Sequence, residues 1–272
     1  MEVSCIKEKL LALKSSLPGK VGYYVKSLQS NAVISYNEDL VFNPASTIKL
    51  LLLCAVLNSA RRGQFCLKDR ITVNDDVKVG GCGVISELMA GLNPTVRDLL
   101  KLMVIISDNT ATNMLFDVAG GATALEEYAC SLGLKETRLR RKLFDTETEA
   151  RGINNAATPF ELSVILEGLA NKTLMHPDDC EEAINMLMRQ QLNNKLPSKV
   201  VSRMEWYAGT NTVKFAHKTG EQENIEHDVG IVFTPKGKIV VAVMTEDVDN
   251  ETAVDFIGNF AKEVVDCFVN VD

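Results

Sequence analysis

Ser46 and Lys49 are the first residues whose types and spacing could carry out chemistry together. They lie three positions apart, after Pro44 and directly before the apolar block 50–57, so a helix is expected to begin near Ser46. Residues three apart share one face of a helix, which brings the lysine amine within reach of the serine hydroxyl. Burial would lower the pKa of Lys49 and let its neutral amine take the serine proton. The pair therefore predicts an activated serine nucleophile, although a plain helix cap followed by a solvated lysine has the same spacing.

Two later motifs could contribute to the same site, although each is weak alone. Ser107-Asp108-Asn109 follows an expected helix at 96–106, and its ordinary role would be to end that helix with polar residues. Lys218-Thr219-Gly220 is expected at the end of a strand, where a glycine turn is the ordinary interpretation. Because both follow the Ser46 pair in this order, a shared site is favoured over three unrelated features.

The bulk composition favours a soluble globular protein that acts on a small molecule. The chain has 272 residues, of which 46% are apolar and 24% charged, and its net charge of −7 disfavours nucleic acid or an anionic membrane as a partner. The longest apolar run, 50–57, is too short to span a bilayer, and charged residues interrupt the N-terminus, so no signal peptide is expected. If Met1 is the natural start, we expect a cytoplasmic protein; if the N-terminus has been trimmed, we expect an extracellular or periplasmic one.

The cysteine and histidine patterns predict no metal site and no other cofactor. The seven cysteines form no Cys-x-x-Cys pair, which indicates reduced and mostly buried thiols. The three histidines are not spaced as metal ligands. His227 either faces the substrate or pairs with its neighbour Asp228, whereas His217 is expected to pack behind the strand that carries Lys218.

Strand patterns lie at both ends of the chain, and helical patterns fill the middle. Strand-like runs occupy residues 21–27, 32–36, 213–217, 229–234 and 239–245. Helical periodicity marks residues 3–17, 251–269 and most of 64–205. This order predicts an α/β (α+β) fold in which one antiparallel sheet, built from both chain ends, is flanked by terminal helices. We expect a single domain over 1–272, with an α/β lobe (1–45 and 206–272), an inserted all-α lobe (46–205) and the site in the cleft between them.

Together, the three motifs resemble those of the class A β-lactamases and penicillin-binding proteins. Asn43-Pro44-Ala45 before Ser46, Gly81-Cys82-Gly83 before the second motif and Thr158-Pro159 after the middle loop are also similar to that family. The resemblance covers nearly the whole chain. It implies a β-lactamase-like fold and a serine acyl-hydrolase that forms an acyl-enzyme with β-lactams or related small amides and esters.

The resemblance also implies a role for each motif residue. Ser46 would be the nucleophile and Lys49 its base or proton relay, while Ser107 would pass the proton to the leaving nitrogen. Lys218 would hold a substrate carboxylate and, by like-charge repulsion, favour a neutral Lys49. The backbone N–H groups of Ser46 and Glu221 would hold the oxyanion. The predicted substrate contacts are Asn109, Thr219, Gly220, Glu221 and His227.

The sequence departs from that family in the loop expected to position the deacylating water. Class A enzymes with fast turnover carry a glutamate there, followed four residues later by an asparagine, whereas this position falls on Leu143, or on Lys142 if the loop shifts by one. Asp145, Glu147 and Glu149 are possible substitutes but are more simply solvated surface acids. We therefore expect slow deacylation.

Two features are similar to a divergent branch of mostly uncharacterised β-lactamase-like hydrolases: an Arg-Lys-x-x-Asp loop, from Arg141 to Asp145, and a His-Asp pair, His227-Asp228, before the strand that follows Lys218. The strand after Lys218 often carries an arginine in class A enzymes, but the stretch Glu226 to Gly230 has none. The loop also holds a basic run at 138–142, which we interpret as a local ion-pair network. Alternative functions on this fold are a penicillin-recognising protein without turnover, or a D-amino-acid peptidase, esterase or acyltransferase that uses Ser46.

Overall fold

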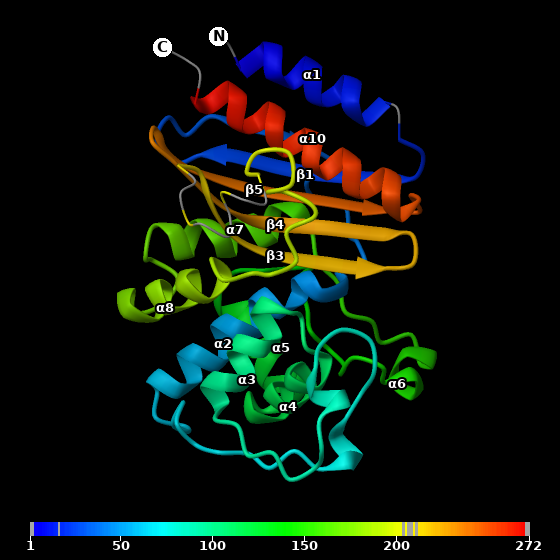
Figure 1. The fold of residues 1–272 in the computed structure, drawn as a ribbon, viewed down its shortest axis with the longest axis vertical. Coiled ribbons are helices and arrows are strands. Elements are labelled where there is room, and N and C mark those ends of the chain that lie inside the picture. The colour runs from blue at the N-terminus through cyan, green and yellow to red at the C-terminus, as the bar shows by residue number, and fades with distance from the viewer. Residues whose placement is uncertain (1–2, 16, 203–204, 206–208, 210–211, 270–272) are drawn as a thin grey trace.

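The computed structural model describes residues 3–15, 17–202, 205, 209 and 212–269. Within this part, strands from both chain ends form one five-stranded antiparallel sheet in the order β2-β1-β5-β4-β3 (Figure 1). The strands are β1 (Lys20–Ser27), β2 (Val33–Tyr36), β3 (Lys214–Gln222), β4 (Ile225–Thr234) and β5 (Gly237–Glu246). The sequence-based prediction of such a sheet is confirmed.

Helices precede, follow and interrupt the sheet strands along the chain. The α-helices are α1 (Val3–Ser15), α2 (Lys49–Arg61), α3 (Val96–Ile105), α4 (Asn109–Val118), α5 (Gly121–Ser131), α6 (Thr146–Ala150), α7 (Pro159–Ala170), α8 (Pro177–Leu187) and α10 (Asn250–Val269). Short 3₁₀ helices are η1 (Ala45–Ile48), η2 (Asp75–Val77) and η3 (Ile85–Glu87). No helix in these described ranges is long and apolar enough to span a membrane.

The two faces of the sheet contribute to two different hydrophobic clusters. Along β5, Val241 and Val243 belong to the cluster that includes residues of α1 and α10, whereas Val240 and Ala242 belong to the cluster that includes α2 and α7. This alternation follows from the two-residue period of a strand. The terminal helices therefore cover one face, as predicted, and the helical middle of the chain packs against the other (Figure 1).

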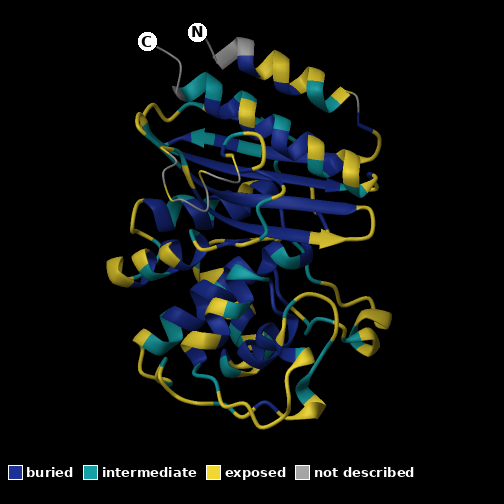
Figure 2. Ribbon diagram, viewed as in Figure 1, coloured by how far each residue is buried: buried dark blue, intermediate teal, exposed yellow. Residues whose placement is uncertain are grey.

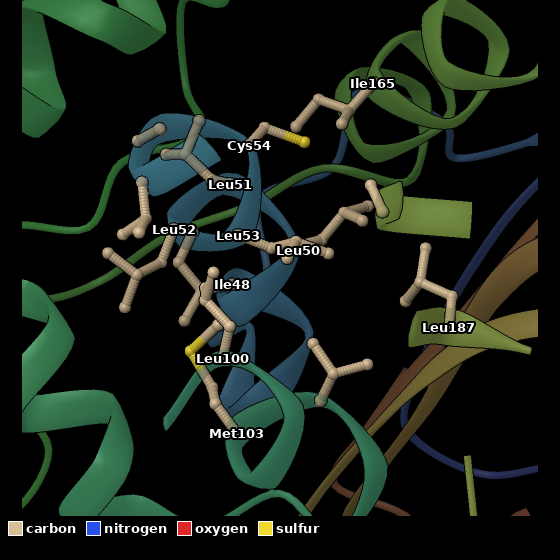
Figure 3. Packing of buried hydrophobic residues seen from close by; sticks show 14 of the residues in the cluster. Ile48, Leu50, Leu51, Leu52, Leu53, Cys54, Leu100, Met103, Ile165 and Leu187 are labelled. Atoms are coloured by element: carbon tan, nitrogen blue, oxygen red, sulfur yellow. The ribbon is translucent and has the colours of Figure 1, made fainter. Parts of the chain in front are cut away.

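The two turns of α2 after Lys49 are apolar on every side, as expected for a helix that is surrounded by protein. Residues 50–57 are each at most 3% exposed, and Figure 3 shows the leucines of α2 among Leu100, Met103, Ile165 and Leu187. Figure 2 shows the same burial as a dark core between the sheet and the exposed lower loops. A helix held this firmly gives its N-terminal residues a fixed position.

Three details differ from the sequence-based expectations. The chain around Ser46 is η1, and α2 begins only at Lys49. The motif Lys218-Thr219-Gly220 lies inside β3 rather than at its end, because β3 stays paired with β4 as far as Gln222 and Ile225. The α5 helix was not predicted as a separate helix from the sequence. The division into two lobes stays a prediction, and α7, which falls within 46–205, contacts β1, β4 and β5.

Candidate active site

Ser46 lies in η1, immediately before the buried helix α2. The turn that presents it is closed by hydrogen bonds from Thr47 N to Pro44 O (3.0 Å) and from Ala45 N to Asn43 Oδ1 (3.1 Å). Ala45 has a φ of +44°, which is costly for a residue with a side chain. Such backbone strain persists only where the surroundings impose it, and it is typical of functional sites.

Lys49 is fully buried, and its amine is held by the Ser107-Asp108-Asn109 motif. Its Nζ donates to Ser107 O (2.7 Å) and to Asn109 Oδ1 (2.8 Å), and it lies 3.0 Å from Ser107 Oγ. Burial, together with the nearby charge of Lys218, lowers the pKa of Lys49 well below its usual value. A neutral amine fits these contacts, since it can donate two hydrogens and accept one from the Ser107 hydroxyl.

Ser107 connects the two lysines of the site. It is 2% exposed, and its Oγ accepts a hydrogen bond from Lys218 Nζ (3.2 Å) while lying beside Lys49 Nζ. Its φ of +59° is a second strained position in the site. Burial and the nearby charge of Lys195 lower the pKa of Lys218 to about 7. The three polar groups form one continuous path for a proton.

Asp108 fixes the second motif against the loop that precedes it. Its carboxylate accepts hydrogen bonds from the N–H groups of Val84 (2.7 Å), Ile85 (2.9 Å) and Ala111 (2.9 Å), so it joins that loop to the start of α4. A Cβ at Gly83 would lie 2.3 Å from Asp108 Oδ2, which explains the glycine there. Asp108 therefore positions its neighbours Ser107 and Asn109.

The Lys218-Thr219-Gly220 segment of β3 lies directly against η1. A Cβ at Gly220 would be 3.1 Å from Pro44 O, so the glycine lets the strand approach the turn that carries Ser46. Thr219 is 2% exposed. The side chain of Glu221 is exposed beyond the segment. The structure thus brings Lys49, Ser107, Asn109 and Lys218 into contact, next to the turn that carries Ser46, while the roles of these residues stay predictions.

His227 differs from both expected arrangements. Its side chain is fully buried; Nε2 lies 2.7 Å from Asn43 O, and Nδ1 accepts from Thr245 N–H (3.1 Å). Because backbone groups occupy both ring nitrogens, the ring offers no free nitrogen for the predicted substrate contact. Asp228 instead lies 2.9 Å from His217 Nδ1, and His217 is packed behind the strand as expected. Among the described residues, no group of three acidic, histidine or cysteine side chains could hold a metal ion.

The burial of His227 predicts a loss of stability in mild acid. Burial lowers the pKa of His227 to about 4 from 6.5, so the unfolded chain binds this proton more readily. The free energy of unfolding should therefore fall between pH 6.5 and 4, by about 3 kcal/mol from this group. Urea unfolding at several pH values measures it. The variant His227→Gln, whose amide can still donate to Asn43 O, should show a flatter dependence; an unchanged slope would contradict the assignment.

Leu143, where the family resemblance puts the deacylating glutamate, lies in the loop between α5 and α6. The side chain of Asn113, in α4, hydrogen-bonds both backbone groups of Leu143. Its Oδ1 accepts from Leu143 N–H (2.8 Å), and its Nδ2 donates to Leu143 O (2.9 Å). Lys142 instead points to Asp117, 2.6 Å away. These contacts hold the backbone at Leu143 and place Lys142 beside Asp117, while the position that corresponds to the family's glutamate stays a prediction.

The acidic residues of the same loop all have other partners. The Asp145 carboxylate caps α6 by accepting from Thr148 N–H, Glu147 pairs with Arg151, and Glu149 lies 2.6 Å from Arg141. The ion-pair interpretation of the basic run is confirmed by the contacts of Arg141 and by the 3.2 Å contact between Arg138 and Glu126. None of these contacts directs a carboxylate toward Ser46.

The structure adds a charged residue that the sequence did not single out. Lys195, in the segment after α8, is buried behind β3, where its Nζ lies 2.5 Å from Glu226 Oε2 and donates to Gly220 O (3.1 Å). The family resemblance predicts a second cation on the strand after Lys218, which has no arginine in the stretch Glu226 to Gly230. Lys195 instead comes from the segment between α8 and β3. The neighbouring Leu196, which is also buried, is the only local sequence signal that this stretch packs inward.

Comparison with known proteins agrees with the fold and the motifs. A family model described as the Beta-lactamase enzyme family matches residues 6–268. The β-lactamase L2 of Stenotrophomonas maltophilia is 28% identical over 229 residues, which is 83% of this chain and 72% of that protein. A solved β-lactamase from Sphaerobacter thermophilus DSM 20745 is 29% identical with a TM-score of 0.88, covering 100% of this chain and 99% of its own.

A penicillin-binding protein is similar to nearly the same extent. The acyl-enzyme complex of PBP-A with penicillin G, in a leucine-to-glutamate variant, has a TM-score of 0.87 and 25% identity, covering 99% of this chain and 98% of its own. The family match spans nearly the whole chain and includes all three motifs. The chain therefore belongs to the β-lactamase enzyme family, as a class A-like serine hydrolase.

Proposed function

We propose that the protein forms an acyl-enzyme on Ser46 with β-lactams or related small amides and esters, and that it releases the acyl group slowly. One observation carries the first half of this proposal. The buried Lys49 amine, the Ser107 hydroxyl and the Lys218 amine lie in contact, next to the turn that presents Ser46. A pure binding protein would have no need for such a proton path.

The acylation step follows from these contacts. Ser46 Oγ bonds to the substrate carbonyl carbon, and its proton moves to the neutral amine of Lys49. As the carbon–nitrogen bond breaks, Ser107 gives its proton to the leaving nitrogen and receives one from Lys49. The charged form of Lys218 attracts a substrate carboxylate, and that carboxylate in turn raises the pKa of Lys218. The N–H groups of Ser46 and Glu221 stabilise the oxyanion.

Slow release of the acyl group is supported by the side chains of the loop at 137–149. Hydrolysis of the acyl-serine needs a water held by a general base. Leu143 cannot serve as that base, and the nearby acids are engaged with Thr148, Arg151 and Arg141. β-Lactams should therefore act as acyl donors that leave the protein blocked for long periods.

Burst kinetics with a chromogenic cephalosporin test this proposal. We expect a burst of ring opening equal to one molecule per protein, followed by a much slower steady rate. Steady turnover without a burst would show that deacylation is not limiting. Absence of both phases would reject β-lactams, and activated esters would then be tried with the same protein.

A further inference from the structure

The buried amine of Lys195 contacts the backbone of the Lys218-Thr219-Gly220 segment, although Lys195 itself lies outside this motif. Its side chain is 1% exposed, and its amine is engaged by one carbonyl and two carboxylates. Its Nζ donates to Gly220 O (3.1 Å) and lies 2.5 Å from Glu226 Oε2 and 3.6 Å from Glu221 Oε2. Lys195 can therefore act on the site in two ways: its charge lowers the pKa of Lys218, and its hydrogen bond holds the Gly220 carbonyl.

The direction of the Gly220–Glu221 peptide follows from its neighbours. Thr219 O accepts a hydrogen bond from Lys218 Nζ (2.8 Å), which places this carbonyl on the side of β3 that faces Ser107. In an extended strand, successive carbonyls point to opposite sides, as do the C=O and N–H of one peptide group. Gly220 O therefore points away from Ser107, and the N–H of Glu221 points toward it. Because β3 is an edge strand, no further strand pairs with the side that faces Ser107.

We propose that Lys195 is a positioning residue that orients and polarises the Gly220–Glu221 peptide, so that the Glu221 N–H becomes a stronger oxyanion donor. A hydrogen bond from an ammonium group is stronger than one between neutral groups. When a carbonyl accepts such a bond, the N–H of the same peptide becomes a better donor, because linked hydrogen bonds polarise one another. The inference rests on the proposed function, which places the oxyanion at this N–H.

Glu226 supplies the countercharge that allows Lys195 to be buried. It is 2% exposed, and its other oxygen accepts from Asn250 Nδ2 (2.7 Å). Buried ion pairs of this kind often contribute little net stability, so replacing both charges together should leave the fold intact. Replacing Lys195 alone would leave a buried carboxylate without its countercharge. The double variant Lys195→Met/Glu226→Gln therefore separates the local role from a general loss of folding.

Two measurements test the inference in the whole protein. The ¹⁵N and ¹H resonances of the Glu221 amide report its polarisation in the free protein. The dissociation constant of phenylboronic acid, which bonds to a serine hydroxyl and places an oxygen among oxyanion donors, reports the strength of the site. In the double variant we expect the Glu221 amide resonances to move upfield and boronate affinity to fall about tenfold. Glu226→Gln, which keeps Lys195 beside the carboxylate of Glu221 (3.6 Å), is the matched control and should retain affinity.

Other results would overturn the inference. Unchanged Glu221 resonances and boronate affinity in the double variant would show that Lys195 has only a packing role, and an equal loss in Glu226→Gln would show the same. If the double variant does not fold, Lys195→Gln/Glu226→Gln, which keeps a neutral donor and leaves no unpaired buried charge, is measured in the same way. If the wild type binds no boronate, the proposed function fails, and the Glu221 resonance alone then decides the inference.

Discussion

Lys49→Met should slow acylation of Ser46 by about 10²- to 10⁴-fold, the usual contribution of a general base. Methionine has a similar length and no ionisable group, so it fits the buried position but removes the proton acceptor. The amine it replaces contacts Ser107 and Asn109, so a small loss of stability is also expected. The rate of adduct formation with a penicillin, followed by mass spectrometry over time, measures the effect.

The pH dependence of the same rate adds a second check. The lowered pKa of Lys49 means that its neutral fraction, and hence the rate, rises with pH. Lys218, with a pKa of about 7, must stay charged to attract a carboxylate, so the rate should fall again above about pH 7. The exposed Lys101→Met is the matched control and should change neither the rate nor its pH profile. Full activity of Lys49→Met would rule out Lys49 as the base.

Leu143→Glu should accelerate deacylation, and therefore steady hydrolysis of β-lactams, by about 10²-fold or more. Asn113 fixes the backbone of Leu143 in the loop where the family resemblance places the deacylating glutamate. A glutamate there would provide the base that this loop lacks. Because class A enzymes have an asparagine four residues later, Leu143→Glu/Glu147→Asn should be faster still. The decay of a preformed penicillin adduct measures the rate directly.

A neighbouring substitution controls for the position of the new carboxylate. Lys142 points to Asp117 on the surface, so Lys142→Glu adds the same side chain one residue away without placing it near Ser46. This variant should deacylate as slowly as the wild type. If Leu143→Glu still forms the adduct and loses it no faster, the loop is not the cause of slow release.

The fold was predictable from the sequence because its signals are local and strong. Short apolar runs marked β4 and β5, and the unbroken apolar block at 50–57 marked a buried helix. The order of strands and helices then left one economical arrangement. The strand ends were less predictable: β3 runs on through Gly220 to Gln222, because pairing with β4 outweighs the turn tendency of glycine.

The site was predictable only where its residues share a motif. Ser46 and Lys49 are close in sequence, and Ser107 and Lys218 belong to short motifs whose order pointed to one site. The contact between Lys195 and Gly220 joins segments 25 residues apart and has no local pattern. The hydrogen-bond partners of His227 could not be predicted either, because Asn43 comes from a turn and Thr245 from β5, both distant in sequence.

The most direct test of Ser46 as the nucleophile is the intact mass of the protein after incubation with penicillin G, for wild type and for Ser46→Ala. We expect the wild type to gain the mass of one penicillin molecule and to keep it long after the free antibiotic is removed. Ser46→Ala, with an unchanged melting temperature, should gain nothing. An adduct on Ser46→Ala, or a wild type that shows neither adduct nor hydrolysed penicillin, would contradict the assignment of Ser46 as the acylated nucleophile.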